Sequence, residues 1–130
     1  EWVDADALKA LLDTYAIPGV AWRTIHFKPF FGNSQGKLLH GVQYFFTDYK
    51  SAPLTLINFY VMQAVHELYP DHDPYVNASK SVNRMTDQVC GTDYVRLNMQ
   101  RNFKVADIEA YWNKDVDSFK ELSRKYHLYD

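Results

Sequence analysis

The sequence has little of what would identify many protein classes. Cys90 is the only cysteine among 130 residues, so neither an internal disulfide nor a cysteine zinc site is available. No apolar run approaches the roughly 20 residues of a membrane span, and the first residues lack the basic and then apolar pattern of a signal peptide. We therefore expect a domain excised from a longer protein, with no membrane span.

Charge of one sign is also lacking. Lysine and arginine number 14 against 16 aspartates and glutamates, and the two signs are interspersed along the chain. Because nucleic acids and anionic membranes are bound largely through clustered positive charge, this balance disfavours both partners. We predict no nucleic-acid partner.

Familiar catalytic and metal-binding signatures are missing. The sequence has no glycine-rich phosphate loop, no GxSxG elbow and no HExxH. The segment DHD at 71–73 is separated by Pro70 from the predicted helix that carries His66, so His66 and His72 do not share a helical face. A polar loop is the preferred interpretation of 71–73, and we predict no metal and no cofactor.

Carboxylates are present, but no pair has the arrangement that hydrolysis needs. Glu67 and Glu109 fall on the polar faces of predicted amphipathic helices, and Asp115 and Asp117 point apart on either side of a valine. Cys90 has no neighbouring basic cluster that would activate it, so a structural thiol is favoured over a nucleophile. We predict no catalytic residue in this chain.

Aromatic residues are abundant, at 16% of the chain with ten tyrosines. Tyrosine joins a wide apolar face to a polar tip, which suits half-buried surfaces, protein interfaces and sugar-binding clefts equally. Composition alone does not choose among these.

Apolar spacing predicts two or three strands and four or five helices. The strands are expected over 20–27 and 40–48. The helices are expected after the cap Asp4, over 54–69, weakly over 77–89, from Thr92 or Asp93 onward, and over 105–126. The prediction is a single compact α+β domain over 1–130, a small β-sheet packed by four or five helices, with a long C-terminal helix that packs along most of the domain.

The stretch HFKPFFGNSQGKLLHGVQ at 26–43 is the best candidate for a functional site. About ten residues separate the two strands, more than a tight hairpin needs. Phe27 is expected in the core. Phe30 and Phe31 are adjacent in an extended segment and face opposite ways, so we expect one of them to face solvent or a ligand.

These residues also carry a family resemblance. The segment IPGVAWRTIHFKPFFGNSQGKLLHGVQYFFTD resembles the pattern LPGVxFRxxxFxPxFxxxxGxxxxGVQxxVTD of the exo-β-N-acetylmuramidase (NamZ-like) family, formerly a domain of unknown function. The matching positions are Pro18, Gly19, Val20, Arg23, Phe27, Pro29, Phe31, Gly36, Gly41, Val42, Gln43, Thr47 and Asp48.

The second half of the chain is similar to the same family. GTDYVR matches GTDxxR, and IEAYWNKDVDSFKELSRKYHLYD is similar to IxxxWxxDxxxFxxxRxxYLLY. The positions in register are Gly91, Thr92, Asp93, Arg96, Ile108, Trp112, Asp115, Phe119, Arg124, Tyr126, Leu128 and Tyr129. His127 stands where the family has a leucine, and Leu39-His40 stands where it has a cysteine-glycine pair, so we expect local packing beside the second strand to differ from that of the family.

The resemblance implies a function that the residues alone do not. Members are two-domain bacterial glycoside hydrolases that release N-acetylmuramic acid from the non-reducing ends of peptidoglycan fragments, in peptidoglycan recycling. This chain would be their C-terminal domain, and the Rossmann-like N-terminal catalytic domain would be its partner, absent here. The family also implies the bacterial cell envelope, periplasmic or secreted. We expect this fragment to be inactive alone.

In such an enzyme the cleft lies between the domains, and a long aromatic loop is suited to form one wall of it. Phe30 or Phe31 would stack on the sugar, and Lys28 or Asn33 would bond the lactyl carboxylate or the N-acetyl group. Gln43 would reach the ligand or a neighbouring backbone group. The predicted substrate-binding residues are His26, Lys28, Phe30, Phe31, Asn33 and Gln43.

Two alternatives stay open. The motif could instead hold the loop and the interface with the missing domain in place. The chain could also be a non-catalytic binding module for muropeptides or a protein partner.

Overall fold

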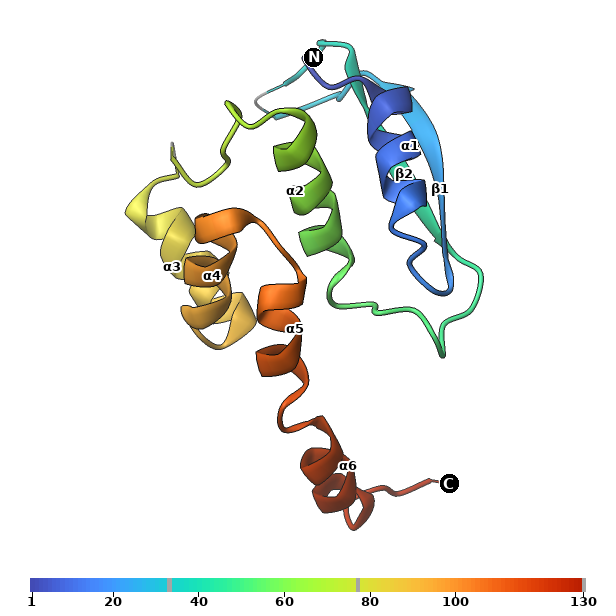
Figure 1. The fold of residues 1–130 in the computed structure, drawn as a ribbon, viewed down its shortest axis with the longest axis vertical. Helices are drawn as coiled ribbons and strands as arrows, with labels where there is room; N and C mark the ends of the chain where they lie inside the picture. The colour runs from blue at the N-terminus through green and yellow to red at the C-terminus, as the bar shows by residue number, and fades with distance from the viewer. Residues whose placement is uncertain (33, 77, 130) are drawn as a thin grey trace. The chain divides into compact units, whose positions relative to one another are not determined.

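The computed structural model describes residues 1–32, 34–76 and 78–129. Its described part holds a two-stranded antiparallel sheet and six helices, or five if the last two are counted as one interrupted helix (Figure 1). In chain order the elements are α1 (Ala5–Thr14), β1 (Val20–Phe27), β2 (Leu39–Phe46), α2 (Ile57–Leu68), α3 (Lys80–Cys90), α4 (Tyr94–Asn102), α5 (Ala106–Asn113) and α6 (Val116–Arg124). The predicted α+β class with a small sheet is confirmed.

Within this fold two compact units can be distinguished, Glu1–Asp73 and Pro74–Asp130. The first contains the hairpin with α1 and α2, and the second contains α3 to α6. Among the described residues, no helix combines the length and the apolarity that a membrane span requires.

Helix α1 begins as its sequence predicts. The Asp4 carboxylate accepts hydrogen bonds from the backbone N–H groups of Asp6 and Ala7, both at 3.0 Å, and so satisfies two donors that have no partner within the helix. Its buried face carries Leu8 and Leu12, which pack against the hairpin and α2. The cap and the apolar spacing together locate this helix.

The hairpin assigns each strand residue to one of two faces. β1 and β2 pair from Val20 with Phe46 to Phe27 with Leu39, and directly opposed residues in an antiparallel pair point to the same side. Trp22 is buried, and Val20, Val42 and Phe46 pack against the same core, so this face is the inner one. The alternate residues therefore form the outer face.

Gly19 fixes the entry to β1. Its φ is +68°, and its carbonyl accepts hydrogen bonds from the N–H groups of Thr47 at 2.9 Å and Asp48 at 3.3 Å. A Cβ at this position would collide with the Asp48 carbonyl oxygen. Only glycine fits here, because it tolerates a positive φ and leaves the space free. These bonds follow β2, which ends at Phe46 rather than at the predicted residue 48.

The core of the first unit is formed by side chains from α1, the hairpin and α2. Its buried members are Leu8, Leu12, Ile17, Trp22, Ile57 and Ala64. Helix α2 begins at Ile57, later than the predicted start at 54, because backbone hydrogen bonds from Leu54 to Ala52 and from Leu56 to Pro53 form turns before it.

In the second unit α3 packs against α4, and α4 against α5. Arg96 of α4 binds Asp87 of α3 through Nε at 2.7 Å and Nη2 at 2.8 Å. This two-bond contact holds the pKa of Asp87 below its usual value. The buried side chains are Val95, Met99, Phe103, Val105 and Ile108.

The predicted long C-terminal helix is confirmed in the segment formed by α5 and α6, with an interruption at Lys114 and Asp115 that the sequence did not predict. Helix α6 contains no buried residue. Its apolar side chains, Phe119 among them, are exposed. The packing of this segment along most of the domain stays a prediction.

Candidate functional site

The loop at 28–38 connects the two strands and is shaped by its backbone. The N–H of Gly36 donates to the Pro29 carbonyl at 3.0 Å, and the N–H of Lys37 donates to the Ser34 carbonyl at 3.1 Å. Gly36 has φ +74° with open space around it, so glycine is needed for its conformation rather than for packing. Lys37 also forms an ion pair with Glu1 at 3.4 Å.

The aromatic side chains of this loop are the most exposed part of the candidate site. Phe30 is 88% exposed and Phe31 is 81% exposed, so both face solvent, where one was expected to do so. Phe27 is 47% exposed, and its predicted place in the core is wrong because it falls on the outer face of β1. Trp22 and Phe27 are an odd number of residues apart in β1, so they point to opposite faces of the strand, and only the face of Trp22 is buried.

His26 faces a second histidine across the hairpin. It is paired in register with His40, and the two Nδ1 atoms lie 2.7 Å apart, joined by a hydrogen bond in which one ring donates and the other accepts. The pair lies on the same face as Trp22, next to the loop. Because His40 already engages the Nδ1 atom of His26, a hydrogen bond from a sugar to that atom would have to replace the hydrogen bond between the two histidines.

Gln43 also has a protein partner. Its Oε1 accepts a hydrogen bond from Arg23 Nε at 2.8 Å, and the Arg23 guanidinium lies 5.0 Å from the centre of the Phe45 ring. The partner is therefore a side chain, rather than the backbone group that the sequence suggested. Gln43 borders a hollow of about 490 Å³ that Phe27 also lines.

The structure separates some of the predicted residues. His26 is on the inner face of the hairpin and Gln43 on the outer face, so the two do not line one surface. Lys28 is exposed at the start of the loop, two and three residues before the exposed Phe30 and Phe31 in the sequence. Asn33 lies outside the described residues. Lys28, Phe30 and Phe31 thus form the part of the predicted site that shares one exposed segment.

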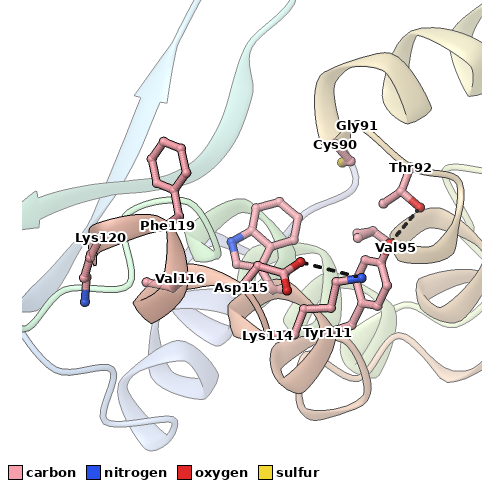
Figure 2. A pocket seen from close by; sticks show the side chains of 11 residues that line it. Cys90, Gly91, Thr92, Val95, Tyr111, Lys114, Asp115, Val116, Phe119 and Lys120 are labelled. Carbon is pink, nitrogen blue, oxygen red and sulfur yellow. Dashed lines mark hydrogen bonds and ion pairs between the residues drawn. The ribbon is translucent and has the colours of Figure 1, made fainter. Parts of the chain in front are cut away.

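A larger cavity, which the sequence did not indicate, lies in the second unit. Its volume is about 610 Å³, and Figure 2 shows Phe119 and Lys120 on one side of it and Thr92 and Tyr111 on the other. The lining residues are Cys90, Gly91, Thr92, Val95, Tyr111, Trp112, Lys114, Asp115, Val116, Phe119 and Lys120. Five of the lining residues also match the family pattern in the second half of the sequence, namely Gly91, Thr92, Trp112, Asp115 and Phe119. Their shared membership of that pattern is the sequence signal that could have located the cavity.

Polar contacts hold the cavity wall in place. Tyr111 donates a hydrogen bond to Thr92 Oγ1 at 3.3 Å, and its ring stacks on Tyr94 with the ring centres 4.1 Å apart. Lys114 Nζ lies 4.2 Å from the centre of the Tyr111 ring and 3.8 Å from the Asp115 carboxylate. Tyr111 therefore links the turn before α4 to the end of α5.

Cys90 lines this cavity without the properties of a nucleophile. Burial, with a further contribution from the negative charge of Asp87, raises the pKa of the Cys90 thiol. A raised pKa keeps the thiol protonated at neutral pH, whereas nucleophilic chemistry requires the thiolate. This agrees with the structural role expected for Cys90.

Comparisons with known proteins relate nearly the whole chain to one family. A family model described as "Exo-beta-N-acetylmuramidase NamZ, C-terminal" matches residues 1–129. The peptidoglycan β-N-acetylmuramidase NamZ of Bacillus subtilis (strain 168) is 26% identical over 128 residues, which are 98% of this chain and 30% of that protein.

A solved structure extends the likeness to the fold. A DUF1343 family protein from Bacteroides fragilis NCTC 9343 is 40% identical, and its crystal structure superposes with a TM-score of 0.95 over 100% of this chain and 34% of that one. The chain thus spans about a third of the length of the relatives it matches.

Proposed function

The chain belongs to the C-terminal domain family of the exo-β-N-acetylmuramidase NamZ, and on that premise we propose that it is the substrate-cleft domain of such an enzyme. The enzyme would release N-acetylmuramic acid from the non-reducing ends of peptidoglycan fragments. Catalysis would need an N-terminal domain, which the length of the relatives accommodates. The bacterial cell envelope, periplasmic or secreted, is the corresponding proposed location.

The observation that carries the proposal is the exposure of two adjacent aromatic rings. Phe30 and Phe31 are 88% and 81% exposed on a loop whose backbone is held by its own hydrogen bonds. An exposed ring loses apolar hydration when it stacks on the apolar face of a sugar, so such a pair is suited to a carbohydrate wall. Neither ring is needed to fill the core.

Lys28 supplies the charge that this ligand requires. N-acetylmuramic acid differs from N-acetylglucosamine by a lactyl ether that ends in a carboxylate. An ammonium group next to the two rings would bind that carboxylate by a charge-assisted hydrogen bond, which is stronger than a neutral one. We propose that Lys28 distinguishes muramic acid from its neutral counterpart.

Two of the described carboxylates are engaged by protein partners, which favours a non-catalytic role for these two residues. Glu67 accepts a hydrogen bond from Tyr15 at 3.0 Å, and Asp87 is bound by Arg96. A general acid needs a carboxyl that stays protonated near neutral pH, and the pKa of Asp87 is shifted in the opposite direction. The proton transfers are therefore assigned to the N-terminal domain.

Hydrolysis of a chromogenic N-acetylmuramide tests the proposal. The three samples are this chain, the N-terminal domain, and the two joined in one protein. Release by the joined protein alone is the expected result, because the cleft is then complete. Release by this chain alone would contradict the proposal, since it would require a catalytic pair within these residues.

A second function is favoured if no sample releases the chromophore. The same exposed rings would then serve a non-catalytic module that binds muropeptides or a protein partner. Calorimetric titration of this chain with a muropeptide shows whether the module binds muropeptides or only a protein partner. Phe31→Ala is the matched variant. Muropeptide binding that the variant loses would support the sugar-binding module.

A further inference from the structure

Helix α6 carries an apolar stripe whose side chains are exposed. Val116, Phe119 and Leu122 recur every three residues and so lie along one side of the helix. Phe119 is 64% exposed and Leu122 is 52% exposed. The polar residues between them, Glu121 for example, complete an amphipathic pattern that ordinarily packs against another element.

The stripe is continuous with the large cavity. Val116 and Phe119 belong to both (Figure 2). Trp112, which also lines the cavity, extends the apolar lining into α5. A helix stripe that continues into a cavity of about 610 Å³ offers both a surface and a recess for inserted side chains.

The relatives are much longer than the region that matches this chain. The matching family is described as a C-terminal one, and the chain covers only 34% of the Bacteroides fragilis protein and 30% of the Bacillus subtilis protein. About two-thirds of each relative therefore lies outside the matched region. A covalently attached domain is present at high effective concentration, so it is the occupant most readily available to an apolar face.

We infer that the α6 stripe and the adjoining cavity form the docking surface for the N-terminal domain of the full-length protein. Phe119 and Leu122 are its central apolar contacts, and the cavity receives an apolar side chain from that domain. The inference rests on the part of the proposed function that joins this chain to an N-terminal domain. It does not depend on sugar binding by the aromatic loop.

Hydrogen–deuterium exchange provides the primary test, because it needs no variant. Backbone amides of α6 are compared between the isolated chain and the full-length protein. Docking predicts exchange at least about tenfold slower in the full-length protein, because α6 then opens less often. Equal exchange in the two proteins would overturn the inference.

Substitution of the stripe provides the second test. The double variant Phe119→Ser with Leu122→Ser should melt about 3 °C or more below the full-length wild type, whereas in the isolated chain it should melt within about 2 °C of its own wild type. Glu121→Ser, on another side of the same helix, is the matched control and should leave both proteins unchanged. An equal loss in both proteins would mean that the stripe packs within this chain and would overturn the inference.

Self-association and activity are measured separately from domain docking. If a second copy of the protein covered the stripe, sedimentation velocity would show a dimer of the full-length wild type and a monomer of the double variant. That result would also overturn the inference. Hydrolysis by the full-length wild type is measured in parallel. Slowed exchange in α6 without hydrolysis would refute the proposed activity and still support the docking surface.

Discussion

Arg23 and Gln43 face one another across the hairpin, with Arg23 Nε donating to Gln43 Oε1 at 2.8 Å. The amide oxygen of Gln43 is thereby engaged as an acceptor, so the donor that the same amide can offer is its NH₂ group. A ligand on the outer face of the sheet would meet that NH₂ group as a donor. Arg23 thus acts as a positioning residue for Gln43.

This geometry predicts a binding defect when Arg23 is truncated. Arg23→Ala frees the Gln43 amide to rotate, so KM of the full-length enzyme for a muropeptide should rise about three- to tenfold, with kcat unchanged. Arg101→Ala, an exposed arginine in α4, is the charge-matched control. If Arg23→Ala leaves KM unaltered, Gln43 is not a substrate contact.

Substitution of Phe31 tests whether its ring contacts the ligand or stabilises the loop. Because its ring is 81% exposed, Phe31→Ala should leave the melting temperature unchanged, while the loss of stacking should raise KM about three- to tenfold. Tyr49→Ala, an exposed aromatic that follows β2 at the other end of the hairpin, is the control. A fall in melting temperature with KM unchanged would instead indicate that Phe31 stabilises the loop.

Two glycines with similar backbone angles should respond differently to alanine. Gly19 at φ +68° has the Asp48 carbonyl in the way of a Cβ, whereas a Cβ on Gly36 at φ +74° would meet no atom of the described residues within 4 Å. Gly19→Ala should lower the free energy of unfolding by about 3 kcal/mol or more, from strain plus collision, and Gly36→Ala by about 1 kcal/mol from strain alone. Urea unfolding measures both, and equal losses would contradict the role of Asp48.

The hairpin shows how far the sequence could predict this structure. β1 was predicted to the residue because branched and aromatic residues fill 20–27 and lie between Gly19 and Pro29. Its alternation separated Trp22 from Phe27, and the structure buries Trp22 and exposes Phe27. Alternation defines two faces, but the buried one is decided by packing against other elements, α1 among them, which the alternation within one strand does not report.

The second unit shows why part of the site was missed. Cys90, Tyr111 and Phe119 line one cavity although they are far from consecutive in the sequence. The spacing of apolar residues within one helix does not show that residues from different helices line the same cavity. The same limit applies to α6, since a stripe such as Phe119 and Leu122 predicts that something covers the helix without saying which part of the protein does so.

Tyr15 gives the protein a predictable loss of stability in alkali. Burial, together with the hydrogen bond to Glu67 and the negative charge of that carboxylate, raises the pKa of the Tyr15 phenol from its ordinary 10.0 to about 12. The folded state thus holds this proton more tightly than the unfolded state does. Its contribution to stability is complete below pH 10.0 and is lost as the pH rises to about 12.

Urea unfolding at several pH values across this window, for wild type and two variants, measures the effect. Tyr15→Phe should remove the part of the alkaline decline that Tyr15 causes, because phenylalanine has no proton to lose. Glu67→Gln should retain a share of it, because burial is the largest cause of the raised pKa and the substitution leaves the ring between α1 and α2. A decline in Tyr15→Phe as steep as in wild type would show that other groups account for the loss. A decline abolished by Glu67→Gln would show that the carboxylate outweighs burial.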